Sequence, residues 1–305
     1  RLSNNKTRIL LSNIEDNKYS IFNQFTEYEP DTCKTQGRLY LGEPLSIVNN
    51  LNMDLVRNEY ANMLMIGSDS DKARSMFAFA MLSLAINYWV SHSKKSPEEP
   101  FVYFLNYKPL RDNYFIDAPD LLATKLLTKY VKNIPISNPG EIKNIIQELY
   151  SSVVVGQSRE LNQSKYLMVF GYQRAEDLKS EEKADEKQDI MSMMSSRNQG
   201  PTHSMKEMVE VLLTMGAQKG VHSIFWQDDF KALDFTDRKF ITYFYQKIAF
   251  DMSKEDYSQF VGINDISQFG ENTAVYNNRI DDTRSFRPYQ SPDEEWLESI
   301  CEPLN

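Results

Sequence analysis

The residues whose types and spacing suggest chemistry lie between an apolar run at 63–66 and a helix-like segment that starts near Arg74. A phosphate-binding loop in that position follows the pattern G-x-x-x-x-G-K-[ST]. Its glycines expose backbone N–H groups, its lysine reaches the terminal phosphates and its hydroxyl holds magnesium. Here the first glycine is present, but Lys72, Ala73 and Arg74 replace the second glycine, the lysine and the hydroxyl. The window consists of Gly67, Ser68, Asp69, Ser70, Asp71, Lys72, Ala73 and Arg74.

Two aspartates, Asp69 and Asp71, stand inside this window. A carboxylate about 4 Å from a phosphate charge costs about 4 kcal/mol at a surface-like dielectric. The loop is therefore predicted to bind a triphosphate poorly. A register shifted by one residue would make Lys72 the phosphate-binding lysine, but Ala73 would then supply no hydroxyl for the metal. ATP and magnesium are expected here only with that shifted loop.

A nucleotide-hydrolysing site also needs an acidic residue at the end of a neighbouring strand, for the metal and the attacking water. The matching apolar run, 166–170, ends at Phe170 and Gly171, and the nearest acidic residue is Glu176. Both required elements are missing together, so the sequence predicts an inactive site. No residue is assigned a catalytic role.

Short apolar runs alternate with segments of helical periodicity along the chain. This alternation predicts an α/β fold with a mostly parallel sheet covered by helices on both faces. The predicted strands are 63–66, 101–105, 166–170, 221–226, 247–251 and 273–276, and the predicted helices are 74–91, 121–131, 141–157, 205–218 and 238–245.

Five segments together resemble the FtsK/SpoIIIE/HerA-like translocase ATPases, which implies a RecA-like P-loop NTPase core over about 39–290. By this resemblance Gln227 matches a sensor of the terminal phosphate, although a polar strand end is the favoured interpretation. Phe170 and Gly171 match the position of the missing acid. The similar segments are Tyr40–Pro44, the strand and helix at 63–84, the Asn106-Tyr107-Lys108 strand end, the Gly-Val-His strand at 216–227 and the segment 248–258.

Active members of that family are ring-forming motors that move DNA or, in type VII secretion, protein. Several carry tandem ATPase domains of which the later ones are degenerate. The resemblance therefore implies a catalytically degenerate domain with a structural or regulatory role, whose partners are neighbouring ATPase domains or subunits. Two alternatives stay open: a weakly active ATPase that uses Lys72, and a peptide-binding module for a translocated partner.

Composition bounds the possible partners. The formal net charge is −9, from 43 acidic and 34 basic residues, so no basic footprint favours direct DNA binding.

Cys33 and Cys301 are expected to be reduced thiols, and the three scattered histidines predict no metal site. The apolar run at 76–90 is too short for a membrane span and is typical of a buried helix. We expect a cytoplasmic domain, associated with a membrane only through other parts of a longer protein.

The expected division of the chain has three parts. Residues 1–38 are interpreted as a linker or the edge of a preceding domain, 39–290 as the ATPase-fold domain, and 291–305 as a tail with a short amphipathic helix. Within the domain, the charged stretch 174–204 is predicted to be a mobile loop.

Overall fold

A nine-stranded sheet forms the centre of the molecule, in a computed structural model that describes residues 37–45, 51, 53–109, 116–154, 161, 163–181, 203–233, 238–265, 272–278 and 283–305. Strands β9, β4, β8, β7, β5 and β6 are parallel, and β10, β11 and β2 continue the sheet as an antiparallel extension. In sheet order the strands are β2 (Gly42–Pro44), β11 (Arg284–Pro288), β10 (Ala274–Asn278), β9 (Gln246–Phe250), β4 (Met63–Ile66), β8 (Val221–Gln227), β7 (Lys165–Phe170), β5 (Val102–Asn106) and β6 (Val131–Ile134).

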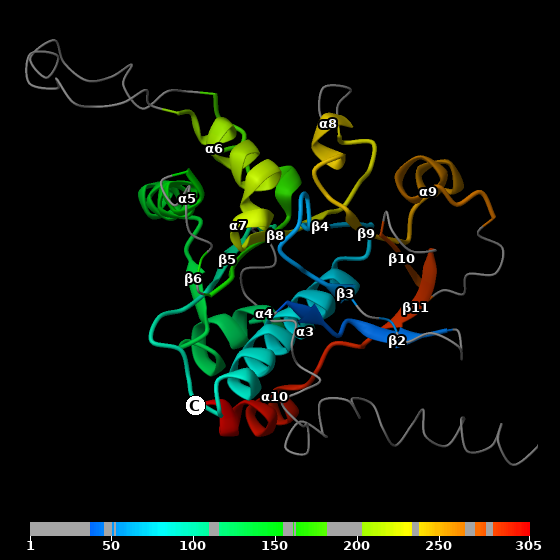
Figure 1. Ribbon diagram of the computed structural model, residues 1–305. Helices are drawn as coiled ribbons and strands as arrows, with labels where there is room; N and C mark the ends of the chain where they lie inside the picture. Colours follow the sequence, from blue (N-terminus) through cyan, green and yellow to red (C-terminus); the bar gives the residue numbers. More distant parts are fainter. Residues whose placement is uncertain are drawn as a thin grey trace, which may run out of the picture.

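Helices cover the sheet on two sides, as Figure 1 shows: α5 to α9 lie above it in that view, and α3, α4 and α10 lie below. Two further strands, β1 (Arg38–Leu39) and β3 (Met53–Asp54), pair with each other in a separate small sheet. The helical elements are α3 (Ser70–Ser91), α4 (Ala118–Leu121), η4 (Leu122–Leu126), α5 (Pro139–Val154), η5 (Tyr172–Arg174), α6 (Met205–Val211), η6 (Leu212–Gly216), α7 (Ala217–Lys219), α8 (Arg238–Ile241), α9 (Lys254–Val261), α10 (Glu294–Cys301) and η8 (Glu302–Leu304).

The alternation of side chains along each strand divides the interior into two cores. Met63 and Met65 of β4 pack into the core around α3, whereas Leu64 and Ile66 pack into the core around α5, α6 and α9. Strands that are buried on both faces need continuous apolar runs, and β4 has all four residues buried. The predicted α/β class, with a mostly parallel sheet and helices on both faces, is confirmed.

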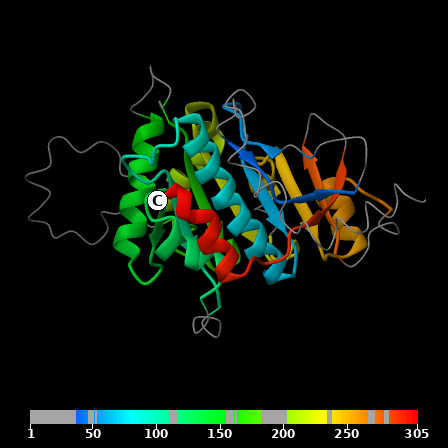
Figure 2. The ribbon, with the colours of Figure 1, turned by 90° about the horizontal axis from the view of Figure 1, so that it is seen from below.

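Helix α3 is enclosed on nearly every side, because α10 lies against it on the side away from the sheet (Figure 2). Its buried polar side chains are hydrogen-bonded instead of exposed. Ser75 donates to the carbonyl of Tyr289, Ser83 accepts from the N–H of Tyr40, and Asn87 donates to a backbone carbonyl of β1. Paired polar groups of this kind cost little to bury.

Three element predictions were wrong in their extent. Helix α3 starts at Ser70 and not at Arg74, because Asp69 caps it. The predicted helix 121–131 is divided between α4 and η4 and then gives way to the edge strand β6, which pairs with β5. The predicted helix 238–245 is only the single turn α8.

The segment 291–305 packs into the molecule through α10 and η8. Leu297 and Leu304 are buried in the core around α3, together with the free thiol of Cys301, whose pKa burial raises to about 12. Cys33 and residues 182–202 of the charged stretch lie outside the described residues, and the three-part division of the chain stays a prediction. Among the described residues, no helix has the length and apolar character that a membrane span requires.

Candidate functional site

The predicted site residues meet at one edge of the sheet, where the parallel strands have their carboxyl ends. In open α/β sheets, ligands bind in the crevice at this edge. The loop after β4 carries the phosphate-loop window, β7 ends at Phe170, β8 ends at Gln227 and β9 is followed by Asp251.

The connection from β4 to α3 is shorter than the sequence window. Only Gly67, Ser68 and Asp69 separate the strand from the helix, so the second half of the window, 70–74, forms the first turns of α3. The backbone N–H groups of those residues therefore point along a helix axis and do not line a wide loop.

The carboxylate of Asp69 occupies the N-terminal end of α3. Its Oδ1 accepts hydrogen bonds from the backbone N–H groups of Asp71 (2.9 Å) and Lys72 (3.1 Å). The free N–H groups of a first helical turn, together with the helix dipole, are what binds a phosphate in sites of this kind. Here the chain's own anion takes that place.

The first residues of the connection are tied to both neighbouring strands. A Cβ atom on Gly67 would lie 2.3 Å from the carbonyl oxygen of Phe250, so only glycine fits. Trp226 Nε1 donates to the carbonyl of Gly67 at 3.1 Å, and Ser68 Oγ donates to the carbonyl of Asp251 at 2.8 Å. These contacts leave the connection little room to reshape around a ligand.

The two cations of the window are held by carboxylates. Lys72 Nζ lies 2.6 Å from Asp251 Oδ2 and 3.6 Å from Asp69 Oδ2. Arg74 contacts Asp71 at 2.8 Å and Asp117 at 3.3 Å.

Further acidic residues at this edge escaped the sequence analysis. Asp117 caps α4 by accepting from the N–H of Asp120, and burial followed by the charge of Asp120 raises the pKa of Asp117. Asp120 in turn binds Lys108 and accepts from Asn106 Nδ2 at 2.8 Å. An Asp-Ala-Pro-Asp sequence is a helix-start signal, so α4 could have been placed from it, but its proximity to Arg74 could not.

The end of β7 has no room for the missing acid. Phe170 is buried, with its ring 4.3 Å from that of Trp226. Gly171 has φ +81°, and a Cβ atom there would lie 2.6 Å from the carbonyl oxygen of Tyr107. Arg174 crosses this position, donating through Nε to the same carbonyl at 2.5 Å and lying 3.4 Å from Asp228.

Gln227 directs its amide into its own loop. The side chain is buried, and Nε2 donates to the carbonyl of Asp229 at 2.8 Å. Its backbone carbonyl accepts from the N–H of Gly67 at 3.1 Å. The geometry is that of a polar side chain that closes a strand end.

The residues at this edge do not fit ATP and magnesium, the groups that bind this kind of site. The helix N-terminus carries Asp69, the two cations of the window, Lys72 and Arg74, are paired, and β7 ends without a carboxylate. Over the part of the chain that the structure describes, no group of three or more His, Cys, Asp and Glu side chains is placed to hold a metal ion.

The six-stranded parallel core carries its strand–short loop–helix unit on β4, the second strand of that core, and solved structures of ATPases have a similar fold. No family model and no curated protein sequence matches the chain. The fold is similar to that of the ATPase domains of the type VII secretion proteins EccC and EssC, so the fold expected from the resemblance to FtsK/SpoIIIE-like ATPases is confirmed.

Three solved structures define the likeness. The cytoplasmic domain of EccC from Thermomonospora curvata is 13% identical with a TM-score of 0.55, over 91% of this chain and 32% of that one. ATPases 2 and 3 of the same EccC, in complex with a signal sequence peptide, are 10% identical with a TM-score of 0.56, over 86% and 42%. ATPases 2 and 3 of EssC from Geobacillus thermodenitrificans are 11% identical with a TM-score of 0.53, over 88% and 48%. The chain thus spans less than half of each of these structures.

Proposed function

We propose that this chain is a non-hydrolysing ATPase-fold domain with a structural or regulatory role in a larger DNA- or protein-translocating motor. The observation that carries the proposal is the position of the Asp69 carboxylate, hydrogen-bonded to the first-turn N–H groups of α3. A phosphate group would need those same N–H groups. The window is therefore vestigial, because it satisfies its own helix end.

Electrostatics at the edge support the same conclusion. A phosphate approaching α3 would meet Asp69 and Asp251, and each carboxylate at about 4 Å repels a phosphate charge by about 4 kcal/mol at a surface-like dielectric. Recruiting Lys72 would break its 2.6 Å contact with Asp251. The nucleotide would have to replace an existing ion pair instead of filling an empty site.

The similar structures suggest the context of the domain. Two of them contain ATPases 2 and 3 of one protein, and this chain covers less than half of each. Neighbouring ATPase domains of the same motor are accordingly the partners we propose. In such a motor, a domain that does not hydrolyse ATP would contribute contacts with the neighbouring ATPase domains instead of ATP turnover.

Calorimetric titration of the chain with ATP and magnesium tests the proposal. We expect no binding in the micromolar range, in buffers with and without magnesium. Submicromolar binding that depends on magnesium would overturn it. The weakly active alternative makes a different prediction: any ATP turnover should be abolished by Lys72→Ala, and turnover that this change leaves intact rejects the use of Lys72.

A peptide-binding role is the second candidate, and one observation favours it. A pocket of about 170 Å³ lies between η5, α6 and α8, with Val209 and Leu213 beside the stacked rings of Tyr172 and Phe240. The similar EccC structure was solved with a signal sequence peptide. Fluorescence anisotropy with that peptide is the test: binding that Phe240→Ala, a change at a partly buried ring of the pocket, weakens supports this role, and no binding rejects it.

A further inference from the structure

Asp251 follows strand β9, and its backbone has an uncommon conformation. Its φ is 48°, in the left-handed region that residues other than glycine seldom adopt. Residues in sparsely populated backbone regions persist only where their surroundings hold them, and they gather at sites with a function. The connection from the end of β9 at Phe250 to the start of α9 at Lys254 consists of residues 251–253 alone. The direction of the chain at Asp251 therefore determines where α9 begins.

Neighbours from two helices hold Asp251 in this conformation. Lys72 Nζ lies 2.6 Å from its Oδ2, and Ser68 Oγ donates to its carbonyl at 2.8 Å. Tyr257 of α9 is also close, because burial and then the charge of Asp251 raise the pKa of the Tyr257 hydroxyl to about 12. The first two contacts come from α3 and the connection that precedes it, and the third comes from α9. Asp251 therefore ties the first turn of α3 to the first turn of α9.

The ion pair between Lys72 and Asp251 lies partly out of water. The Lys72 side chain is 14% exposed and the Asp251 side chain is 31% exposed. A partly buried pair is screened less by salt than an exposed one, and exposed pairs contribute little to stability. Lys125 and Glu298 form such an exposed pair, with side chains 55% and 50% exposed. We therefore expect the pair at Asp251 to restrict the chain locally and the pair at Lys125 to do so much less.

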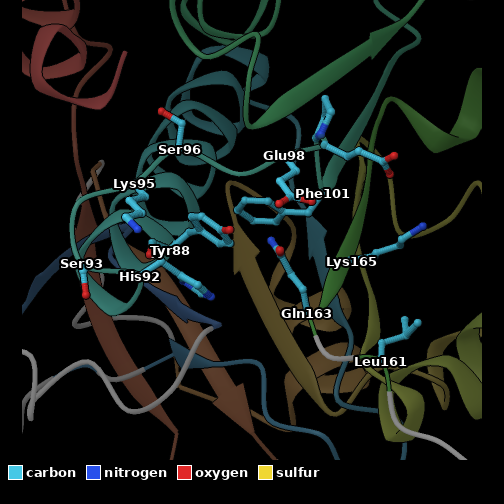
Figure 3. Close-up of a pocket in the computed structure, with 12 residues that line it drawn as sticks. Tyr88, His92, Ser93, Lys95, Ser96, Glu98, Phe101, Leu161, Gln163 and Lys165 are labelled. Atoms are coloured by element: carbon cyan, nitrogen blue, oxygen red, sulfur yellow. Dashed lines mark hydrogen bonds between the residues drawn. The ribbon is translucent and has the colours of Figure 1, made fainter.

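The last turn of α3 is different, because it ends at an open cavity of about 670 Å³. Side chains of both charges line this cavity, as Figure 3 shows for Lys95, Glu98 and Lys165, and this mixture favours no one class of ligand. The stacked rings of Tyr88 and His92, 3.9 Å apart, lie at the same end of the helix. This end is about 25–30 Å along the helix from Lys72. It therefore serves as an internal reference for changes at the first turn.

We propose that the Lys72–Asp251 ion pair is a conformational lock, which fixes the start of α9 against the first turn of α3 through the chain's own charges. The carboxylate of Asp251 supplies the negative charge that a phosphate group would offer to the lysine. The lock holds this edge of the sheet in one arrangement, as fixed contacts with neighbouring domains require. It rests on the proposed function in one respect, because a bound nucleotide would compete with Asp251 for Lys72.

Hydrogen exchange of the full chain, followed by mass spectrometry of its peptides, tests the lock. Lys72→Met removes the cation and keeps an unbranched side chain, so the amides of α9 should exchange about fivefold faster. The amides of α5 and of the last turn of α3 should keep their rates. Lys72→Arg keeps the cation and should keep the original rates in α9. Asp251→Asn removes the charge but tolerates the left-handed backbone, so it should act as Lys72→Met does.

The double variant shows whether the two residues act as one unit. Lys72→Met together with Asp251→Asn should speed exchange in α9 no more than either change alone, because residues in contact are not additive. Lys125→Met is the matched control, since it removes the cation of the exposed pair with Glu298 and should leave exchange in α10 unchanged.

Three results would overturn the lock: unchanged exchange of α9 in Lys72→Met, an equal acceleration in α5, or additive effects of the two changes. An equal acceleration in α5 would mean that the pair stabilises the whole fold instead of one connection. These measurements use the chain alone and are therefore independent of the calorimetric titration. ATP binding in that titration would reject the proposed function, whereas the exchange rates of α9 decide on the lock.

Discussion

At the scale of single residues, Gly171 shows why an acidic side chain does not fit at the end of β7. Its φ of +81° is a conformation that side chains adopt only with strain, and its Cβ position is taken by the carbonyl of Tyr107 and the guanidinium of Arg174. Tyr107 and Arg174 fill the space beside this strand end, and only glycine fits at position 171.

We expect Gly171→Ala to lower the free energy of unfolding by about 3 kcal/mol, from backbone strain and steric overlap together. Gly262 is the matched control, since it has φ +77° but nothing within 4 Å of its Cβ position. Gly262→Ala should cost only the strain, about 1 kcal/mol. Urea denaturation measures both values. Equal losses for the two variants would show that Tyr107 and Arg174 do not restrict the site.

The buried side chain of His222 makes the free energy of unfolding depend on pH. Its ring is buried on β8, with Nδ1 2.9 Å from the carbonyl oxygen of Ala61, and desolvation lowers its pKa to about 4. Between pH 6.5 and pH 4 the unfolded chain binds a proton at this residue and the folded chain does not. The free energy of unfolding therefore falls as the pH falls through this window, by about 3 kcal/mol in full and by about 2 kcal/mol between pH 7 and pH 5.

Urea denaturation at pH 7 and pH 5 checks this contribution. His222→Gln cannot titrate, so its stability should fall by about 2 kcal/mol less over this interval than that of the unmodified chain, whatever its absolute value. Identical pH dependence in the chain and in His222→Gln would contradict the assignment.

At the scale of elements, the start of α3 depends on its cap. Asp69→Ala removes the acceptor of two first-turn hydrogen bonds and should lower the free energy of unfolding by about 1 kcal/mol. Asp69→Asn keeps a side-chain oxygen and should lose much less, because Asn caps helices about as well as Asp. Denaturation of both variants distinguishes capping from charge: equal losses would mean that the ion pair with Lys72, and not the cap, stabilises this end.

At the scale of the whole molecule, α10 completes the core around α3. Leu297 is 1% exposed, and Phe79 and Trp296 lie with ring centres 6.0 Å apart. Leu297→Ala should lower the free energy of unfolding by about 3 kcal/mol. Lys125 pairs with Glu294 and Glu298 on the same helix, but the three side chains are exposed, so Lys125→Ala should give no measurable change in the same thermal or urea melt. If Leu297→Ala changed the free energy of unfolding as little as Lys125→Ala, α10 would contribute nothing to the core.

The central strands could be placed from local pattern alone. The predicted bounds of β4, Met63–Ile66, are those found in the structure, and the predicted strands 166–170 and 221–226 each differ from β7 and β8 by one residue at one end. These strands are buried on both faces, which requires continuous apolar runs that the sequence shows directly. β6 could not be placed in this way. Its sequence, Val-Lys-Asn-Ile, is half polar, and it becomes a strand because β5 offers it a hydrogen-bonding edge.

The order of residue types along the chain determined the α/β class and the departure of residues 67–74 from the phosphate-loop pattern, since both are local properties of the sequence. Which carboxylates pair with the two cations of this window was decided only by the tertiary structure. Asp251 reaches Lys72, Asp117 reaches Arg74 and Arg174 closes the end of β7 across long separations in sequence. The parallel sheet brings the ends of distant strands to one edge, and only there do these charges become neighbours.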